Sequence, residues 1–277
     1  MNIPTFNMSF YMSNLNMYTI DAIRAGIRTA TTRCYDSEIN LIKSLSHGQP
    51  VRFVRTDNKT KEVVDSIIVF ATSYASYTSD VYKQLPPYHS IIDDDYIKHW
   101  CQLEGWNESF AKGYFTSNKG KKLWQFTYDL YPPTYNYSSD NITELRYIDE
   151  VFVYGANTNA KHGLGAAKQA MKFGAKYGVN GYCGSTYGLI TTDLNVSQRP
   201  SIPMSLLEDE VSKFISFAKD NTHLTFLVTE VGCGLAGFTI EQVAPLFKPV
   251  LLNSITNVRL PKRFVRQLIV SSIEGLL

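Results

Sequence analysis

Two segments in the second half of the chain each combine a buried strand, a glycine loop and a helix, in that order. The first starts with the apolar run VFVYGA at 151–156 and passes through a loop at 157–165 into a helix-forming run. The second starts with LTFLVTEV at 224–231 and passes through a loop at 232–238 into a helix from Ile240, with Thr239 as its N-cap. Short β-branched runs predict buried strands, and glycine loops let backbone N–H groups approach an anion. Because ligands of open α/β sheets bind at the carboxyl ends of the strands, the two loops predict one shared ligand site.

Strand and helix alternate through the rest of this half. The clearest helix is expected at 205–220, where apolar residues recur on one face and acidic residues fill the first turn. Short strands are expected at 189–192 and 250–252, a closing helix at 259–277, and a glycine-rich loop packed closely against something at 174–188. This alternation predicts a mostly parallel sheet in a three-layer α/β domain.

The length of 277 residues favours two domains, and the segment YPPTYNYSSD has the prolines and polar residues of a linker. We expect domains at 1–133 and 141–277 with a linker at 134–140. The formal net charge of +2 gives no bulk attraction for nucleic acid, and no apolar stretch is long enough to span a membrane. The four cysteines are scattered without metal-ligand spacing, and no secretory signal is visible. We therefore expect a cytoplasmic protein with reduced thiols, no metal and no cofactor.

The first half combines short helices with strands joined by hairpins. Helical spacing of apolar residues is present at 18–26, and a second helix is expected at 37–45 with Ser37 as its cap. Alternating or β-rich runs predict strands at 51–55, 63–74 and 123–130. This content predicts a small α+β barrel.

Four motifs of this half, IRAGIRTATTR, GQPVRFV, LEGWNESF and WQFTYDL, resemble those of ASCH domains. The resemblance covers about 17–131 and implies a PUA-like β-barrel fold and a link to RNA binding. Some small family members are amidohydrolases that use a lysine, a threonine and a glutamate. Thr31 and Glu104 match the last two, whereas Arg28 stands at the lysine position and cannot act as a base or nucleophile.

The resemblance therefore implies a second binding site, for an anion or a base, at Arg28, Thr31, Arg33 and Glu104. The alternative interpretation is structural. In it, the two arginines lie on a solvated strand face and the threonines are simply good strand formers.

The two glycine loops, within HGLGAAKQAMKFGAKYG and LTFLVTEVGCGLAGF, are similar to those of macrodomains. In that family a strand ends in an asparagine before the first loop, and the second loop ends in an aromatic residue. The resemblance implies a macrodomain-like fold that binds ADP-ribose or a related nucleotide, with the loops on the diphosphate and distal ribose. The implied contact residues are Asn157, Gly163, Leu164, Gly165, Gly232, Cys233, Gly234, Leu235, Ala236, Gly237 and Phe238. The chain departs from the family pattern in having fewer glycines in the first loop and an insert at 177–187.

Three side chains beside these loops are candidates for chemistry. His162 could act as a general base near a ribose, or hydrogen-bond a loop carbonyl. Glu230 could orient a ribose hydroxyl or a water, or be a surface carboxylate at a strand end. Cys233 could have a thiol pKa lowered by loop N–H groups, or be present for its small size. If the site is catalytic, we expect a hydrolase acting on ADP-ribose derivatives, with His162 and Glu230 as catalytic residues.

Two functions of different class follow. The first is binding or hydrolysis of an ADP-ribose-type nucleotide by the second domain, with the first domain recognising RNA or a modified base. The second is a non-catalytic RNA-binding protein whose macrodomain-like half is a scaffold. The first requires the asparagine and the loop glycines to converge on one cleft, and a cleft filled by Tyr182 or Tyr187 would exclude it.

Overall fold

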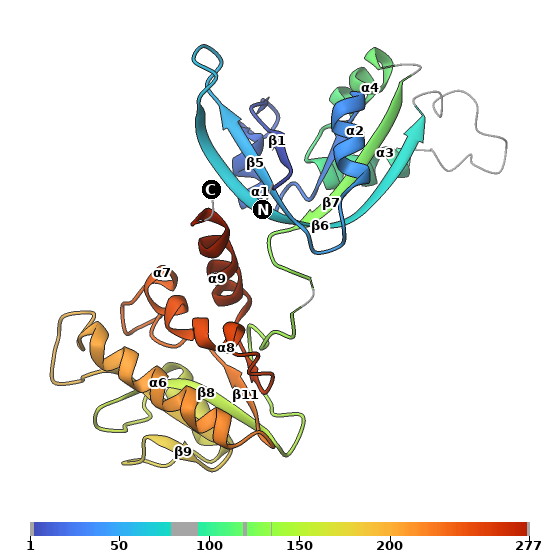
Figure 1. Cartoon of the computed structure of the whole chain (residues 1–277). Coiled ribbons are helices and arrows are strands. Elements are labelled where there is room, and N and C mark those ends of the chain that lie inside the picture. The colour runs from blue at the N-terminus through green and yellow to red at the C-terminus, as the bar shows by residue number, and fades with distance from the viewer. Residues whose placement is uncertain (1–2, 79–93, 119–120, 134, 276–277) are drawn as a thin grey trace. The chain divides into compact units, whose positions relative to one another are not determined.

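The computed structural model describes residues 3–78, 94–118, 121–133 and 135–275 (Figure 1). The chain forms two compact units, unit 1 at Met1–Thr134 and unit 2 at Tyr135–Leu277. Among the described residues, no helix has both the length and the apolar character needed to cross a membrane.

Unit 1 mixes strands with short helices. Its elements are β1 (Thr5–Asn7), β2 (Tyr11–Met12), β3 (Met17–Tyr18), α1 (Thr19–Arg24), β4 (Ala30–Arg33), α2 (Asp36–Lys43), β5 (Pro50–Thr56), β6 (Val63–Thr78), α3 (Asp94–Glu104), α4 (Glu108–Ser117) and β7 (Lys122–Asp129). The expected strands and the two expected helices are present. The expected cap of the second helix is wrong, because α2 begins at Asp36 and its N-cap is Tyr35, which places Ser37 inside the first turn.

The main sheet of unit 1 has the order β1-β5-β6-β7-β4, and β2 pairs with β3 in a separate two-stranded sheet. β1 runs parallel to β5, and the remaining pairs of the main sheet are antiparallel. The long strand β6 curves through the unit (Figure 1), and its register with β7 shifts between Ala71 and Ser73. Aromatic side chains fill the core, with the Phe6 and Phe126 rings 5.2 Å apart between centroids.

Unit 2 alternates strands and helices. Its elements are β8 (Glu150–Asn157), α5 (Gly165–Ala170), η3 (Met171–Phe173), β9 (Gly181–Cys183), β10 (Thr186–Thr192), α6 (Met204–Asp220), β11 (Thr225–Val228), α7 (Ile240–Val243), η4 (Ala244–Phe247), α8 (Lys248–Leu252), β12 (Val258–Arg259) and α9 (Lys262–Glu274).

The sheet of unit 2 has the order β12-β11-β8-β10-β9 and is parallel except for β9, which runs antiparallel to β10. Successive side chains of a strand point to opposite faces. Val151 and Val153 therefore pack on one side with residues of α6 and α9, whereas Phe152 and Tyr154 pack on the other with residues of α5. Helices thus cover both faces of a mostly parallel sheet.

Four expectations for unit 2 differ from the structure. The first turn of α6 holds no acidic residue, because the helix begins at Met204 and its first acidic residue, Glu208, lies in the next turn. The strand expected at 250–252 is wrong, because these residues belong to α8, in which only Val250 is buried. The loop expected at 174–188 instead contains β9 and the start of β10. Within it, a Cβ on Gly184 would lie 2.8 Å from the carbonyl oxygen of Gly174, which confirms the expected close packing. Finally, the segment expected as a linker is anchored in unit 2, because buried Ser138 donates its hydroxyl to the Val228 carbonyl at 2.7 Å.

Candidate functional site

Three loops of unit 2 leave the carboxyl ends of three neighbouring parallel strands. The first loop (157–165) follows β8, the second loop (232–238) comes after β11, and the third loop (193–203) follows β10. Because these strands are parallel, all three loops start from one edge of the sheet. The sequence pattern predicted the first two as binding loops and missed the third.

The three loops enclose a cleft of about 840 Å³. Nine residues predicted to contact a ligand or take part in chemistry line it: Asn157, Gly163, Leu164, Gly165, Glu230, Gly232, Gly234, Leu235 and Ala236. Tyr182 and Tyr187 are not among the lining residues. Both rings instead pack near Phe217, at centroid distances of 5.1 and 5.2 Å.

The second loop is shaped by a few backbone hydrogen bonds. The N–H groups of Cys233, Gly237 and Phe238 donate to the carbonyls of Glu230, Gly234 and Gly232, at 3.0 to 3.1 Å. In the described structure, the N–H groups of the intervening residues 234–236 make none of these bonds. Backbone N–H groups of a glycine loop that are not used in hydrogen bonds within the loop can donate to an anion.

Asn157 gives the first loop its shape. Its side-chain amide donates to the carbonyl of Lys161 at 2.6 Å, and its side-chain oxygen accepts from the N–H of Lys161 at 3.0 Å. The intervening residue Ala160 has a positive φ of 47°. At the end of this loop, Leu235 of the second loop would lie 3.9 Å from a Cβ on Gly165. The first two glycine loops therefore approach each other closely.

Three residues expected to contact the ligand are absent from the cleft lining. Phe238 is buried in the core beneath the second loop. Gly237 has a φ of +87°, and its backbone packs against Arg199 of the third loop. Cys233 is partly buried, and this burial, together with nearby Glu230, raises the pKa of its thiol to about 12. The suggested lowering of that pKa is therefore wrong.

His162, the expected general base, is buried beside the first loop and is not a lining residue. Its Nε2 lies 2.9 Å from the carbonyl oxygen of Lys176, and its ring contacts those of Tyr154 and Tyr177. Of the two roles considered for His162, the structure shows the hydrogen bond to a loop carbonyl.

The charged groups of the cleft are one carboxylate and two cations. Glu230 accepts a hydrogen bond from Arg263 of α9 at 2.9 Å. The negative charge of Glu230 is therefore partly neutralised by an arginine that does not line the cleft. Lys161 of the first loop and Arg199 of the third are both exposed. The sequence patterns did not indicate Arg199 as a cleft residue, although its loop follows the short strand expected at 189–192.

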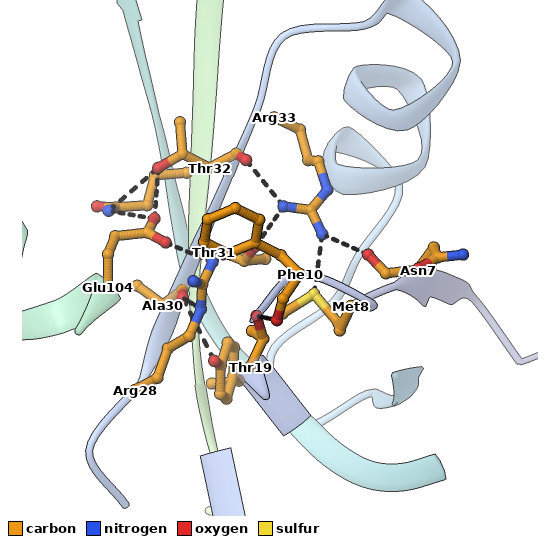
Figure 2. Close-up of polar contacts among 12 residues, drawn as sticks. Asn7, Met8, Phe10, Thr19, Arg28, Ala30, Thr31, Thr32, Arg33 and Glu104 are labelled. Carbon is orange, nitrogen blue, oxygen red and sulfur yellow. Dashed lines mark hydrogen bonds and ion pairs between the residues drawn. The ribbon is translucent and has the colours of Figure 1, made fainter. Parts of the chain in front are cut away.

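The second predicted site, in unit 1, is a buried ion-pair network (Figure 2). Arg28 pairs with Glu104 at 2.6 Å, with only 5% of the arginine side chain and none of the glutamate side chain exposed. Thr32 donates its hydroxyl to the same carboxylate, and Gln125 donates its amide at 3.1 Å. The interpretation of Arg28 as part of a solvated strand face is therefore wrong.

Arg33 extends this network toward β1. It shares the Thr31 hydroxyl with Arg28, at 2.5 and 3.2 Å (Figure 2). Arg33 pairs with Glu38 at 3.0 Å. It also donates to the backbone carbonyl of Asn7 at 3.2 Å, so a β4 side chain reaches the strand at the other end of the sheet order. Thr31, Arg33, Arg28 and Glu104 are thus brought together, with their polar groups directed at one another.

Among the residues that the structure describes, no group of three or more His, Cys, Asp or Glu side chains is placed to hold a metal ion. Comparisons with models of protein families, with curated proteins and with solved structures find no match to this chain.

Proposed function

We propose that unit 2 is a macrodomain-like module that binds a phosphate-bearing nucleotide of the ADP-ribose type. The observation that carries this proposal is the convergence of two glycine loops on one cleft, with the N–H groups at 234–236 left over by the loop's own hydrogen bonds. Such donors, with the nearby cations Lys161 and Arg199, suit a diphosphate. The cleft volume of about 840 Å³ lies within the usual range for small-molecule sites.

Binding is the function that the geometry supports best. Of the two residues proposed for catalysis, only Glu230 lines the cleft. A carboxylate there is placed to accept a hydrogen bond from a ribose hydroxyl or a water. If an ADP-ribose derivative is hydrolysed, Glu230 is the side chain we propose to orient the attacking water. For unit 1 we propose a structural role for the Arg28–Glu104 network within a PUA-like fold, because its polar groups already pair with each other.

Gly234 offers a direct test of the proposed site. A Cβ at this position would meet no atom within 4 Å, and its φ lies outside the left-handed region, so a side chain fits without strain. Gly234→Glu should place a carboxylate in the cleft and abolish binding of ADP-ribose, measured by calorimetry on the full-length protein. Gly234→Ala is the matched control and should bind with nearly the affinity of the natural protein. Equal binding by Gly234→Glu would count against the cleft as the site.

A further inference from the structure

The third loop contributes residues to the lining of the cleft. Leu194, Ser197 and Arg199 of this loop line it, together with Thr191 and Thr192 of the preceding strand. The base of the loop is closed by a hydrogen bond from the N–H of Asp193 to the hydroxyl of Ser201, at 2.9 Å. Asp193 also accepts a hydrogen bond from Thr158 of the first loop at 3.2 Å. Hydrogen bonds therefore hold the third loop in place at its base and link it to the first loop.

Arg199 is held in place within this loop. Its guanidinium donates to the backbone carbonyls of Val196 and Gln198, the second at 3.0 Å, through the same terminal nitrogen. Its stem packs on the second loop so closely that a Cβ on Gly237 would lie 2.8 Å from the Cβ of Arg199. A side chain that is tethered in this way loses less conformational entropy when it binds a ligand.

The charge of Arg199 is not balanced by a carboxylate in the described part of the chain. The acidic residue of the cleft, Glu230, pairs instead with Arg263 at 2.9 Å. A guanidinium has five N–H donors in a planar fork, so the two carbonyl contacts through one nitrogen leave further donors for a ligand. A planar fork of this kind suits the paired oxygens of a phosphate group.

We propose that Arg199 is the specificity-determining residue of the cleft, and that it binds a phosphate group of the ligand. This inference rests on the proposed nucleotide site and adds the residue that selects phosphorylated over unphosphorylated ligands. The glycine loops offer N–H dipoles, whereas Arg199 supplies a full charge from the third side of the cleft. A nucleoside without phosphate should therefore gain nothing from Arg199.

The test is calorimetry on full-length protein with ADP-ribose, AMP, inorganic pyrophosphate and adenosine, using the natural protein and Arg199→Gln. Losing a charge-assisted hydrogen bond should weaken the three phosphate ligands by about tenfold or more and leave adenosine unchanged. Arg199→Lys should restore only part of the affinity, because it keeps the charge and loses the fork. Raising the salt concentration should weaken binding by the natural protein more than by Arg199→Gln. Lys172→Gln, which removes one exposed positive charge of unit 2 outside the cleft lining, is the control and should bind like the natural protein.

The outcomes separate this inference from the proposed function. If nucleotides bind, Gly234→Glu abolishes binding, and Arg199→Gln binds phosphate ligands like the natural protein, the role of Arg199 is overturned and the nucleotide site stands. If no nucleotide binds but pyrophosphate binds in a way that requires Arg199, the nucleotide proposal fails and the anion-binding role stands. If neither nucleotides nor pyrophosphate bind, both are overturned.

Discussion

Arg28 and Glu104 form an ion pair in the interior of unit 1, with both side chains almost fully removed from solvent. Burying two charges is costly, and their attraction offsets this cost only when the remaining polar atoms are also bonded. Thr32 and Gln125 both donate to Oε1 of the carboxylate, Oε2 lies 2.6 Å from the Arg28 guanidinium, and Ala30 accepts a hydrogen bond from the Arg28 Nε at 3.1 Å. The pair is therefore best understood as part of the core, in which each partner needs the other.

Removing one charge of this pair should destabilise unit 1 strongly. Glu104→Gln leaves the buried Arg28 without its counter-charge, and breaking a buried pair in this way typically costs about 3–5 kcal/mol. Urea unfolding followed by circular dichroism would measure the loss. The double variant Arg28→Met, Glu104→Gln should be less unstable than the single variant, because no unpaired charge remains. A loss below about 1 kcal/mol for Glu104→Gln would contradict a buried, paired state.

A second ion pair of unit 1 should make stability depend on acid pH. Arg24 donates to both carboxylate oxygens of Asp65, at 2.8 and 2.5 Å, and this contact holds the pKa of Asp65 below its usual value. A lowered pKa means that the pair stabilises the fold at neutral pH and that this contribution is lost as the pH falls through the folded-state pKa.

Asp65→Asn should therefore lower the stability at pH 7 by up to about 1 kcal/mol, because the pair is partly exposed and screened by solvent. Near pH 2 the natural protein and the variant should differ less, since Asp65 is then losing its charge. Thermal melts of both proteins across this pH range measure the difference. A difference that stays constant from pH 7 to pH 2 would argue against the pair.

At the level of elements, the cleft depends on how closely the second and third loops pack. Gly237 is the point of contact, because its φ of +87° and the neighbouring Arg199 leave no room for a side chain. Its importance is structural, which explains why a residue expected to touch the ligand is absent from the cleft lining. The same reasoning applies to Gly174 and Gly184, because the backbone of Gly184, in the turn between β9 and β10, touches that of Gly174.

Gly237→Ala should weaken both stability and nucleotide binding. The left-handed conformation alone costs a residue with a side chain about 1–2 kcal/mol, and the new methyl group would displace the third loop. A thermal melt and a calorimetric titration with ADP-ribose would measure the two effects. Gly234→Ala is the matched control, because its Cβ meets open space. Unchanged stability and affinity in Gly237→Ala would show that close packing of the second and third loops is not needed for the fold or for binding.

Sequence patterns predicted the elements with strong periodicity and missed those set by tertiary contacts. The helix α6 and the strands β8 and β11 were predicted within a few residues, because burial gives each a clear pattern. The strand prediction at 250–252 was wrong because a short apolar run is compatible with a strand and with a buried helix alike. The third loop carries no glycine motif, so only the parallel strand before it indicated its position.

Side-chain environments were harder to predict than elements. The motif resemblance placed Arg28 and Glu104 at one site but did not show that they form a buried ion pair, because Glu104 lies far along the chain. Similarly, the position of Cys233 between glycines suggested a low thiol pKa, whereas burial raises that pKa. Both properties depend on which residues of other elements pack nearby.

At the level of the whole molecule, each compact unit has hydrophobic clusters of its own. Among the described residues, the clusters of unit 2 draw their members from 137–269 and those of unit 1 from 6–130. A unit that contains its own core can in principle fold alone.

We therefore expect the fragment 135–277 to fold by itself. Circular dichroism should show a cooperative thermal transition, and ADP-ribose in excess should raise its midpoint, since ligands that bind only the folded state stabilise it. The fragment keeps Tyr135 to Asp140 because buried Ser138 is hydrogen-bonded within unit 2. A fragment that shows no cooperative transition would mean that unit 2 depends on unit 1.

An ADP-ribose-type nucleotide is the proposed ligand of the cleft between the glycine loops. The most direct test is a calorimetric titration of the full-length protein with ADP-ribose, carried out in parallel on Gly234→Glu and Gly234→Ala. We predict saturable binding to the natural protein and to Gly234→Ala, and no binding to Gly234→Glu. Absence of binding to the natural protein, or equal binding to all three, would contradict this assignment of the ligand and its site.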